Sequence, residues 1–318
     1  MVIWAHDRHM TAPPPRCAPA LAVLLTLLSA CGAGGSGNES GSRVDVQASF
    51  YPLQWIAEQV GADAVSVASL TPPGAEPHDL ELTPRDVAAL GEADLVVYLA
   101  DFQPAVDEAI DQEASGTALD AAAYGSLELT YTPIEEGEEA TDEAGATDPH
   151  FWLDPMRLAD VADAVAERLG ELDPDNAEQF NGNAAQLRSS LEGLDNEFTE
   201  GLAACDNTDL VTSHNAFGYL AQAYGLTQVG ITGLTPEEEP SAADLAEVAD
   251  FVEENDVRTI YYETLISSAI ADAVASETGA QTAVLDPLEG LTDESSGSDY
   301  LEVMRSNLDS LRAGQPCD

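Results

Sequence analysis

Lysine is absent from the 318 residues, and ten arginines stand against 59 aspartates and glutamates, giving a formal net charge of −49. A chain this acidic has no basic patch that could neutralise nucleic-acid phosphates, so we expect no nucleic-acid partner. Because 44% of the residues are apolar, the charge indicates a folded protein with an acidic surface rather than a disordered chain. Such a surface is best tolerated in concentrated salt, where the Debye length is short, and this favours a saline exterior.

Long apolar runs are also lacking. The longest, APALAVLLTLLSA at 18–30, is too short to cross a bilayer as a helix, which needs about 20 residues. Because it follows two arginines, it predicts a signal peptide over residues 1–30. The run ends in LSAC, which resembles the lipobox of bacterial lipoproteins and implies that Cys31 is acylated and begins a flexible tether, 31–43. We therefore expect an extracytoplasmic protein, anchored by lipid to the outer face of the cell membrane; a plain secretory cleavage site is the alternative.

Cysteine is scarce, with four residues in the whole chain. Cys17 is removed with the predicted signal peptide and Cys31 is assigned to lipid. Cys205 and Cys317 then form the remaining pair in an exported, oxidising setting, which predicts a disulfide between them. Two free buried thiols are the alternative. The pair is too far apart in sequence to resemble a zinc-ribbon site.

Strand-like apolar runs alternate with helical patterns along the body of the chain, which predicts parallel sheets. The predicted strands are 44–50, 64–70 and 93–99 in one half, and 207–213, 225–231, 257–263 and 280–286 in the other. The fold class is therefore α/β, with two similar lobes whose sheets are largely parallel, joined by one long, rigid helix. The predicted boundaries are an N-terminal lobe at 44–172, an interlobe helix at 173–204 and a C-terminal lobe at 205–318.

Histidine is rare as well, and its positions are informative. Two of the five histidines lie at the extreme N-terminus, which leaves His78, His150 and His214 for the folded body. His78 and His214 each follow a predicted strand, and His150 precedes a predicted helix start at Asp154. Ligands bind α/β sheets at the carboxyl ends of the strands, where Asp286 also falls. Each lobe thus offers two candidate ligands.

Three imidazoles and one carboxylate make a chemically sensible tetrahedral zinc set. Taken singly, a histidine in a loop is more often a surface or hydrogen-bonded residue than a ligand. The equivalent positions of His78, His150, His214 and Asp286 at strand ends and helix starts strengthen the metal hypothesis, but from the spacing alone it stands level with that alternative. Glu263, which ends the strand 257–263, is a reserve ligand or, in preference, a helix cap or a carboxylate that orients a ligating imidazole.

Several segments together resemble one known family. They are ASFYPLQWIAEQVGAD, GAEPHDLELTPRD, DPHFWLDP, VTSHNAFGYLAQAYGL, TPEEEPSAADLAEV and VLDPLEGL. In this order they resemble the signature blocks of the ZnuA-like, or cluster A-I, zinc- and manganese-binding receptors of ABC importers, over nearly the whole chain from Val46 to Leu311. The resemblance implies a lipid-anchored receptor, expected to be a monomer, that holds zinc in the interlobe cleft and delivers it to an ABC-type membrane permease.

The same resemblance assigns the ligands as His78, His150, His214 and Asp286. Family members that favour manganese commonly have glutamate where this chain has His214, so the imidazole favours zinc, with a manganese-selective receptor as the alternative. Zinc-specific members often carry a His-rich loop before the DPHFW-type block. Here that place holds an acidic insert, 134–148, without histidine, which we interpret as a solvated segment in preference to a weak cation antenna.

Two other classes of function remain as alternatives. A site of three histidines with a free fourth position could belong to a zinc hydrolase that activates water. The sequence has no HExxH motif and no nucleophile elbow, and a carboxylate is available to close the fourth position. A closed coordination sphere suits carriage rather than catalysis, so we expect no enzyme. Cell adhesion is a weaker alternative that nothing in the sequence singles out.

Overall fold

The computed structural model describes residues 43–133, 143–237 and 239–317. The predicted signal peptide (1–30), Cys31 and nearly all of the tether (31–43) lie outside the described residues, as does most of the acidic insert. The described residues all belong to one compact unit, Ser42–Asp318. Within them, no helix is both long and apolar enough to cross a membrane.

The first half of this unit builds a four-stranded parallel sheet in the order β2-β1-β3-β4. Its strands are β1 (Val44–Ala48), β2 (Val65–Ser69), β3 (Leu95–Tyr98) and β4 (Ala118–Asp120). Its helices are α1 (Tyr51–Gly61), α2 (Pro84–Glu92) and α3 (Pro104–Ala109). Three of the strands were predicted from the sequence. The strand β4 was missed because three residues are too few to show an alternating pattern.

The second half repeats this topology in the order β6-β5-β7-β8, again with parallel pairing throughout. Its strands are β5 (Asp209–Thr212), β6 (Thr227–Gly230), β7 (Thr259–Tyr262) and β8 (Gln281–Val284). Its helices are α6 (Gly218–Tyr224), α7 (Ala242–Glu254), α8 (Ala269–Thr278) and α9 (Tyr300–Gly314). All four strands fall where the sequence predicted them, and the α/β class with two parallel-sheet lobes is confirmed.

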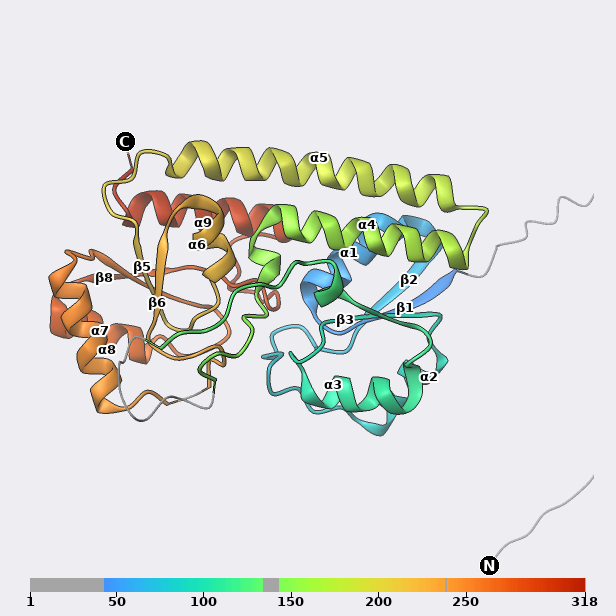
Figure 1. Ribbon diagram of the computed structural model, residues 1–318, viewed down its shortest axis with the longest axis horizontal. Helices are drawn as coiled ribbons and strands as arrows, with labels where there is room; N and C mark the ends of the chain where they lie inside the picture. Colours follow the sequence, from blue (N-terminus) through green and yellow to red (C-terminus); the bar gives the residue numbers. More distant parts are fainter. Residues whose placement is uncertain (1–42, 134–142, 238, 318) are drawn as a thin grey trace, which may run out of the picture. The chain divides into compact units, whose positions relative to one another are not determined.

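Two helices lie between the two sheets in the sequence and pack along each other in space. The first is α4 (Pro155–Leu172) and the second is α5 (Ala177–Leu202), whose 26 residues extend about 39 Å at 1.5 Å per residue. Figure 1 shows α5 running past α4 and α1 of the first lobe and on to α9 of the second. The long connecting helix is thus present. It begins at Ala177 rather than at residue 173, because Asp173 and Pro174 lie in the turn that ends α4.

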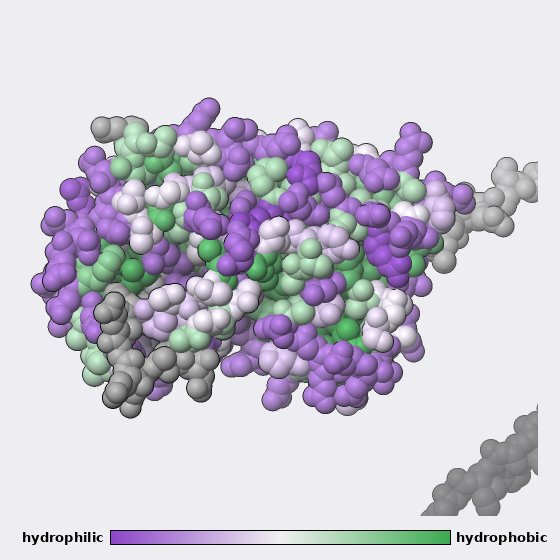
Figure 2. All heavy atoms as spheres, in the orientation of Figure 1, coloured by the Kyte–Doolittle hydropathy of each residue, from purple (hydrophilic) through white to green (hydrophobic). Residues whose placement is uncertain are grey.

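The hydrophobic core explains how the two lobes are held together. Its largest cluster contains side chains from both lobes, including Phe50 and Trp152 from the first and Tyr219 and Leu285 from the second, packed against α5. Two smaller clusters lie on the outer faces of the sheets, under α2 and α3 in one lobe and α7 and α8 in the other. Hydrophilic side chains surround the apolar patches on the face shown in Figure 2. Because the largest cluster is continuous, moving one lobe as a rigid body against the other would disrupt it.

The predicted disulfide is present. Cys205 and Cys317 are bonded, with a sequence separation of 112 residues. The backbone amide of Asp206 also donates to the carbonyl of Pro316 at 3.0 Å. The bond therefore ties the segment after α5 to the end of the chain.

Candidate metal site

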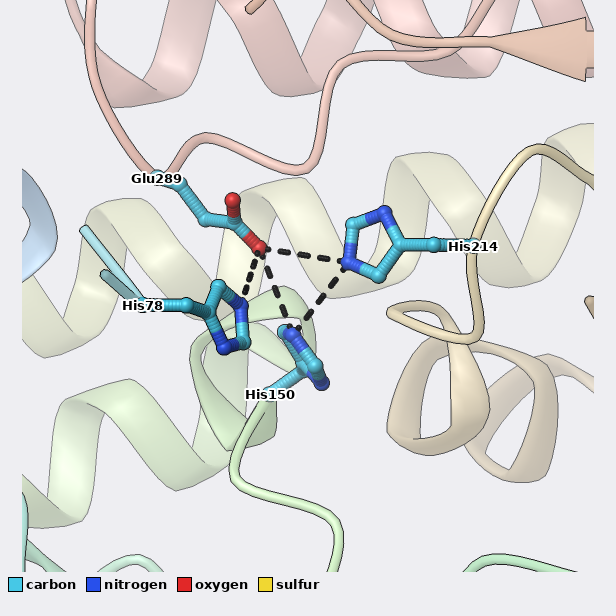
Figure 3. Close-up of side chains that lie close together, drawn as sticks. All are labelled: His78, His150, His214 and Glu289. Carbon is cyan, nitrogen blue, oxygen red and sulfur yellow. Dashed lines mark hydrogen bonds and ion pairs between the residues drawn. The ribbon is translucent and has the colours of Figure 1, made fainter. Parts of the chain in front are cut away.

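Three histidines and one glutamate converge in the interior of the molecule. His78 lies in the loop after β2, His150 precedes α4, His214 comes two residues after β5, and Glu289 follows β8. Figure 3 shows that their side chains point toward one another. His150, His214 and Glu289 are completely buried, and His78 is 8% exposed. Each lobe supplies two of the four groups, as the sequence predicted, although the second lobe supplies a different carboxylate.

The carboxylate of Glu289 lies close to all three imidazoles. The Oε1 atom of Glu289 lies 3.4 Å from Nε2 of His78, 3.3 Å from Nε2 of His150 and 3.4 Å from Nε2 of His214. The Nε2 atoms of His150 and His214 are 3.5 Å apart. All four candidate ligand atoms lie within 4.8 Å of one another. One oxygen thus faces three nitrogens at nearly equal distances.

These distances fit a tetrahedral metal ion. With metal–ligand bonds of 2.0–2.1 Å, neighbouring ligand atoms in a tetrahedral zinc site lie about 3.3–3.4 Å apart. The other carboxylate oxygen of Glu289, Oε2, is buried and has no hydrogen-bond partner among the described residues. A buried carboxylate that faces only imidazole nitrogens is costly without a cation, because burial removes its hydration. The residues present therefore fit a divalent metal held by three nitrogens and one oxygen.

Asp286 does not join this group, in contrast to the prediction. Its side chain is buried, but Oδ1 accepts from the backbone amide of Leu288 at 2.8 Å. Its Oδ2 accepts from the hydroxyls of Thr264 and Ser295, each at 3.2 Å. Its carboxylate is thus engaged in holding the loop. Glu289, three residues further along, occupies the place for which the sequence predicted Asp286.

Two carboxylates fix the orientation of two of the imidazoles. Asp148 accepts from Nδ1 of His150 at 2.8 Å, and Oε1 of Glu263 accepts from Nδ1 of His214 at 2.6 Å. With the Nδ1 proton held there, the lone pair of Nε2 is free to bind a metal. Glu263, predicted as a reserve ligand or an orienting partner, has the position of an orienting partner. Asp148 was not singled out from the sequence, although it is part of the DPHFWLDP block.

Burial and these carboxylates act in opposite directions on the pKa values of the site. Burial alone would lower the pKa of His150 and of His214. Asp148 and Glu289 nevertheless raise the pKa of His150, and Glu263 and Glu289 raise that of His214 well above its usual value. Burial would raise the pKa of Glu289, but the three facing histidines hold it well below its usual range. Without a metal, the cluster therefore binds protons in its place.

Buried side chains hold the loop that carries His78 in place. Gln103, which is 1% exposed, donates through Nε2 to the carbonyl of Pro77 at 3.1 Å and to the hydroxyl of Thr71 at 3.0 Å. The ring of Phe102 packs edge-on against His78, with centroids 4.6 Å apart. Glu76 in the same loop lies 4.0 Å from Nε2 of His78. Burial, and then the charge of Glu289, raise the pKa of Glu76 to about 9.

The segment that carries His150 ends in the predicted helix start. Asp154 caps α4 by accepting from the amide of Met156 at 2.9 Å, and Pro155 takes the first helical position. Trp152 is completely buried and packs against His150, with ring centroids 5.1 Å apart. The indole of Trp152 donates to the carbonyl of Pro287 at 2.7 Å. This bond joins the His150 segment directly to the loop that carries Glu289.

Comparison with known proteins places the chain in a family. The family model for the periplasmic zinc-uptake complex component A, ZnuA, matches residues 46–314. The chain belongs to the ZnuA family. It is 36% identical over 305 residues to the high-affinity zinc uptake system protein ZnuA of Bacillus subtilis, covering 92% of this chain and 95% of that protein. It is 35% identical over 303 residues to the zinc-binding lipoprotein AdcA of Streptococcus pneumoniae, of which it spans 60%.

Solved structures of ZnuA-family proteins have the same fold. The Zn(II)-bound ZnuA-like domain of Streptococcus pneumoniae AdcA aligns with a TM-score of 0.70 and 34% identity, covering 86% of this chain and 99% of that domain. The laminin-binding protein Lmb of Streptococcus agalactiae aligns with a TM-score of 0.74 and 33% identity, with the same coverage. That protein is described as bifunctional, with adhesin and metal-transporting activity.

Proposed function

We propose that this ZnuA-family protein is an extracytoplasmic receptor that binds one zinc ion through His78, His150, His214 and Glu289 and delivers it to the permease of an ABC importer. The observation that carries the proposal is the set of nearly equal distances, 3.3–3.4 Å, between Oε1 of Glu289 and the three Nε2 atoms. The zinc-binding and zinc-uptake names of its relatives support the same cargo.

Zinc is favoured over manganese by the ligand set. Three imidazoles and one carboxylate suit zinc, whereas manganese prefers oxygen ligands and a higher coordination number. In the order of affinities for nitrogen and oxygen sites, manganese also stands below zinc. A manganese-selective receptor would bind its ion more tightly with several oxygen ligands, whereas Glu289 is the one oxygen donor in this set.

Carriage is favoured over hydrolysis because Glu289 closes the fourth position. A catalytic zinc site keeps one position open for water or substrate. Here Oε1 of Glu289 faces all three histidine nitrogens, so a bound zinc would have four protein ligands. The zinc would then be stored and handed on rather than used to activate water.

Export and anchoring complete the proposal. Residues 1–30 would direct export, and acylated Cys31 would hold the receptor at the outer face of the membrane, within reach of the permease. The largest core cluster includes side chains from both lobes, so release of the metal would follow movement of the loops that carry the ligands rather than a wide opening of the lobes.

Equilibrium metal analysis of the purified chain without residues 1–30 tests the proposal. We expect one zinc ion per chain, binding that competes with a high-affinity chelator, and manganese binding that is weaker by orders of magnitude. Zinc uptake in cells that carry the cognate permease should depend on this receptor. Zinc-dependent hydrolysis of an ester or peptide substrate, or a preference for manganese, would contradict the proposal.

A further inference from the structure

The loop that carries Glu289 adopts a strained backbone conformation. Leu288 has φ +59°, in the left-handed region that residues with a Cβ atom rarely adopt. Leu288 is also completely buried, next to a glutamate that is completely buried. Strained residues of this kind persist only where the surroundings hold them, and they occur often at functional sites. The turn at Leu288 is what directs Glu289 toward the histidines.

Asp286 makes the contacts that hold this turn. Its Oδ1 accepts from the amide of Leu288 at 2.8 Å, which closes a local turn across Pro287. Its Oδ2 accepts from the hydroxyls of Thr264 and Ser295 at 3.2 Å each. Thr264 lies just after β7, and Ser295 lies in the loop between β8 and α9. Asp286 is 3% exposed. One buried side chain therefore connects three segments around the turn.

The backbone on either side of the turn is fixed as well. Asn307 of α9 accepts from the amide of Asp286 at 2.9 Å and donates to its carbonyl at 2.7 Å. The indole of Trp152 donates to the carbonyl of Pro287 at 2.7 Å. These hydrogen bonds fix the loop that carries Glu289 to α9 of the second lobe and to the His150 segment of the first lobe.

We infer that Asp286 is a positioning residue for zinc binding: it stabilises the left-handed turn at Leu288 and so places Oε1 of Glu289 in contact distance of the three Nε2 atoms before the metal arrives. The inference rests on the proposed function, in which Glu289 is a ligand. A preformed fourth ligand avoids the cost of ordering the loop upon binding, and this saving raises the affinity. Loss of the Asp286 contacts frees the loop, and Glu289 can then leave the site.

A double-mutant cycle between Asp286 and Glu289 tests the inference, with zinc affinity measured by chelator competition. Glu289→Ala should lower affinity strongly. Asp286→Ala should lower it by about 10- to 100-fold, the range seen when a group that orients a metal ligand is lost. In the Glu289→Ala background, Asp286→Ala should change affinity by less than about threefold, because the ligand through which it acts is gone. Asp286→Asn, which retains an acceptor for the amide of Leu288, should recover most of the affinity.

Asp299→Ala is the matched control. Asp299 caps α9 by accepting from the amide of Glu302 at 2.9 Å, so its loss removes a similar structural hydrogen bond without touching the turn. It should lower thermal stability while leaving zinc affinity unchanged. If Glu289→Ala leaves the affinity unchanged, the ligand set is wrong and the inference fails with it. If Glu289→Ala weakens binding but Asp286→Ala does not, or if Asp286→Ala weakens it equally with and without Glu289, the inference alone is overturned.

Discussion

Zinc affinity should fall steeply as the pH is lowered, and the fall should begin above the ordinary histidine pKa of about 6.5. His150 and His214 have raised pKa values because Asp148, Glu263 and Glu289 stabilise their charged forms. A protonated Nε2 cannot bind metal, so zinc must displace these protons. Glu289, whose pKa is held well below its usual range, adds no competition until the solution is strongly acidic.

The size of the effect follows from the number of protons displaced. Each proton released upon binding changes the affinity tenfold per pH unit, or about 1.4 kcal/mol. If His150 and His214 both carry protons in the metal-free protein, the affinity falls about 100-fold per pH unit, and about 10⁴-fold over two units.

The assay is zinc titration against a chelator at several pH values, with the chelator's own proton competition subtracted. Proton release can be measured independently by calorimetry in buffers of different ionisation enthalpy. We expect at least two protons released per zinc ion near pH 6. Fewer than one proton released, together with an affinity that is flat between pH 7 and pH 5 but sensitive to molar salt, would refute the three-histidine site and favour binding to surface carboxylates.

Metal-free protein should show the opposite trend in stability. A histidine whose pKa is raised by folding contributes stability that is fully present below its unfolded pKa, near 6.5, and is lost as the pH rises through its folded pKa. His150 and His214 are of this kind. Glu76, with a pKa raised to about 9, also destabilises the fold increasingly as the pH rises from about 4.5 toward 9. Metal-free protein should therefore be more stable at pH 6 than at pH 9, whereas the added stability from zinc should be larger at pH 9.

Further predictions follow from the ligand geometry, the disulfide and the shared core. His150→Ala should lower zinc affinity by more than about 100-fold and Asp148→Asn by about 10- to 100-fold, both with an unchanged circular dichroism spectrum of the metal-free protein; unchanged affinity in a chelator competition would remove the residue from the site. Reduction of the Cys205–Cys317 bond should lower the free energy of unfolding by about 4 kcal/mol, measured in urea. A thiol reagent should label neither cysteine in unreduced, unfolded protein. Small-angle scattering should give radii of gyration for metal-free and zinc-loaded protein that differ by less than about 1 Å, because the core cluster that includes both lobes resists their separation.

The fold was predictable because its signals are local and repeated. Seven of the strands show short apolar runs with turn residues at their ends, and caps such as Asp154-Pro155 mark helix starts in the sequence itself. The histidines could be placed because each lies in a loop that follows a strand or leads into a helix. The predicted start of α5 was four residues too early, because Asp173-Pro174 can open a helix or, as here, lie in the turn before one.

The fourth ligand, a carboxylate, could not be chosen from the sequence by the same reasoning. Asp286 lies nearest to the end of β8, and a simple extension of the strand favours it over Glu289. The left-handed turn at Leu288 reverses that order, because Asp286 is used to hold the turn and Glu289 is carried to the metal position. No glycine marks this turn, so the sequence offers no sign of the positive φ. The presence of two carboxylates in LDPLEG was the available signal.

The central claim is that three imidazoles and one carboxylate oxygen hold the zinc ion. X-ray absorption spectroscopy at the zinc edge, on protein loaded with one equivalent of zinc, tests it most directly. The account predicts four nitrogen or oxygen ligands at about 2.0–2.1 Å, with the outer-shell scattering of three imidazole rings, and two such rings in His150→Ala protein. A six-coordinate shell of oxygens, or a spectrum that fits without imidazole rings, would contradict it.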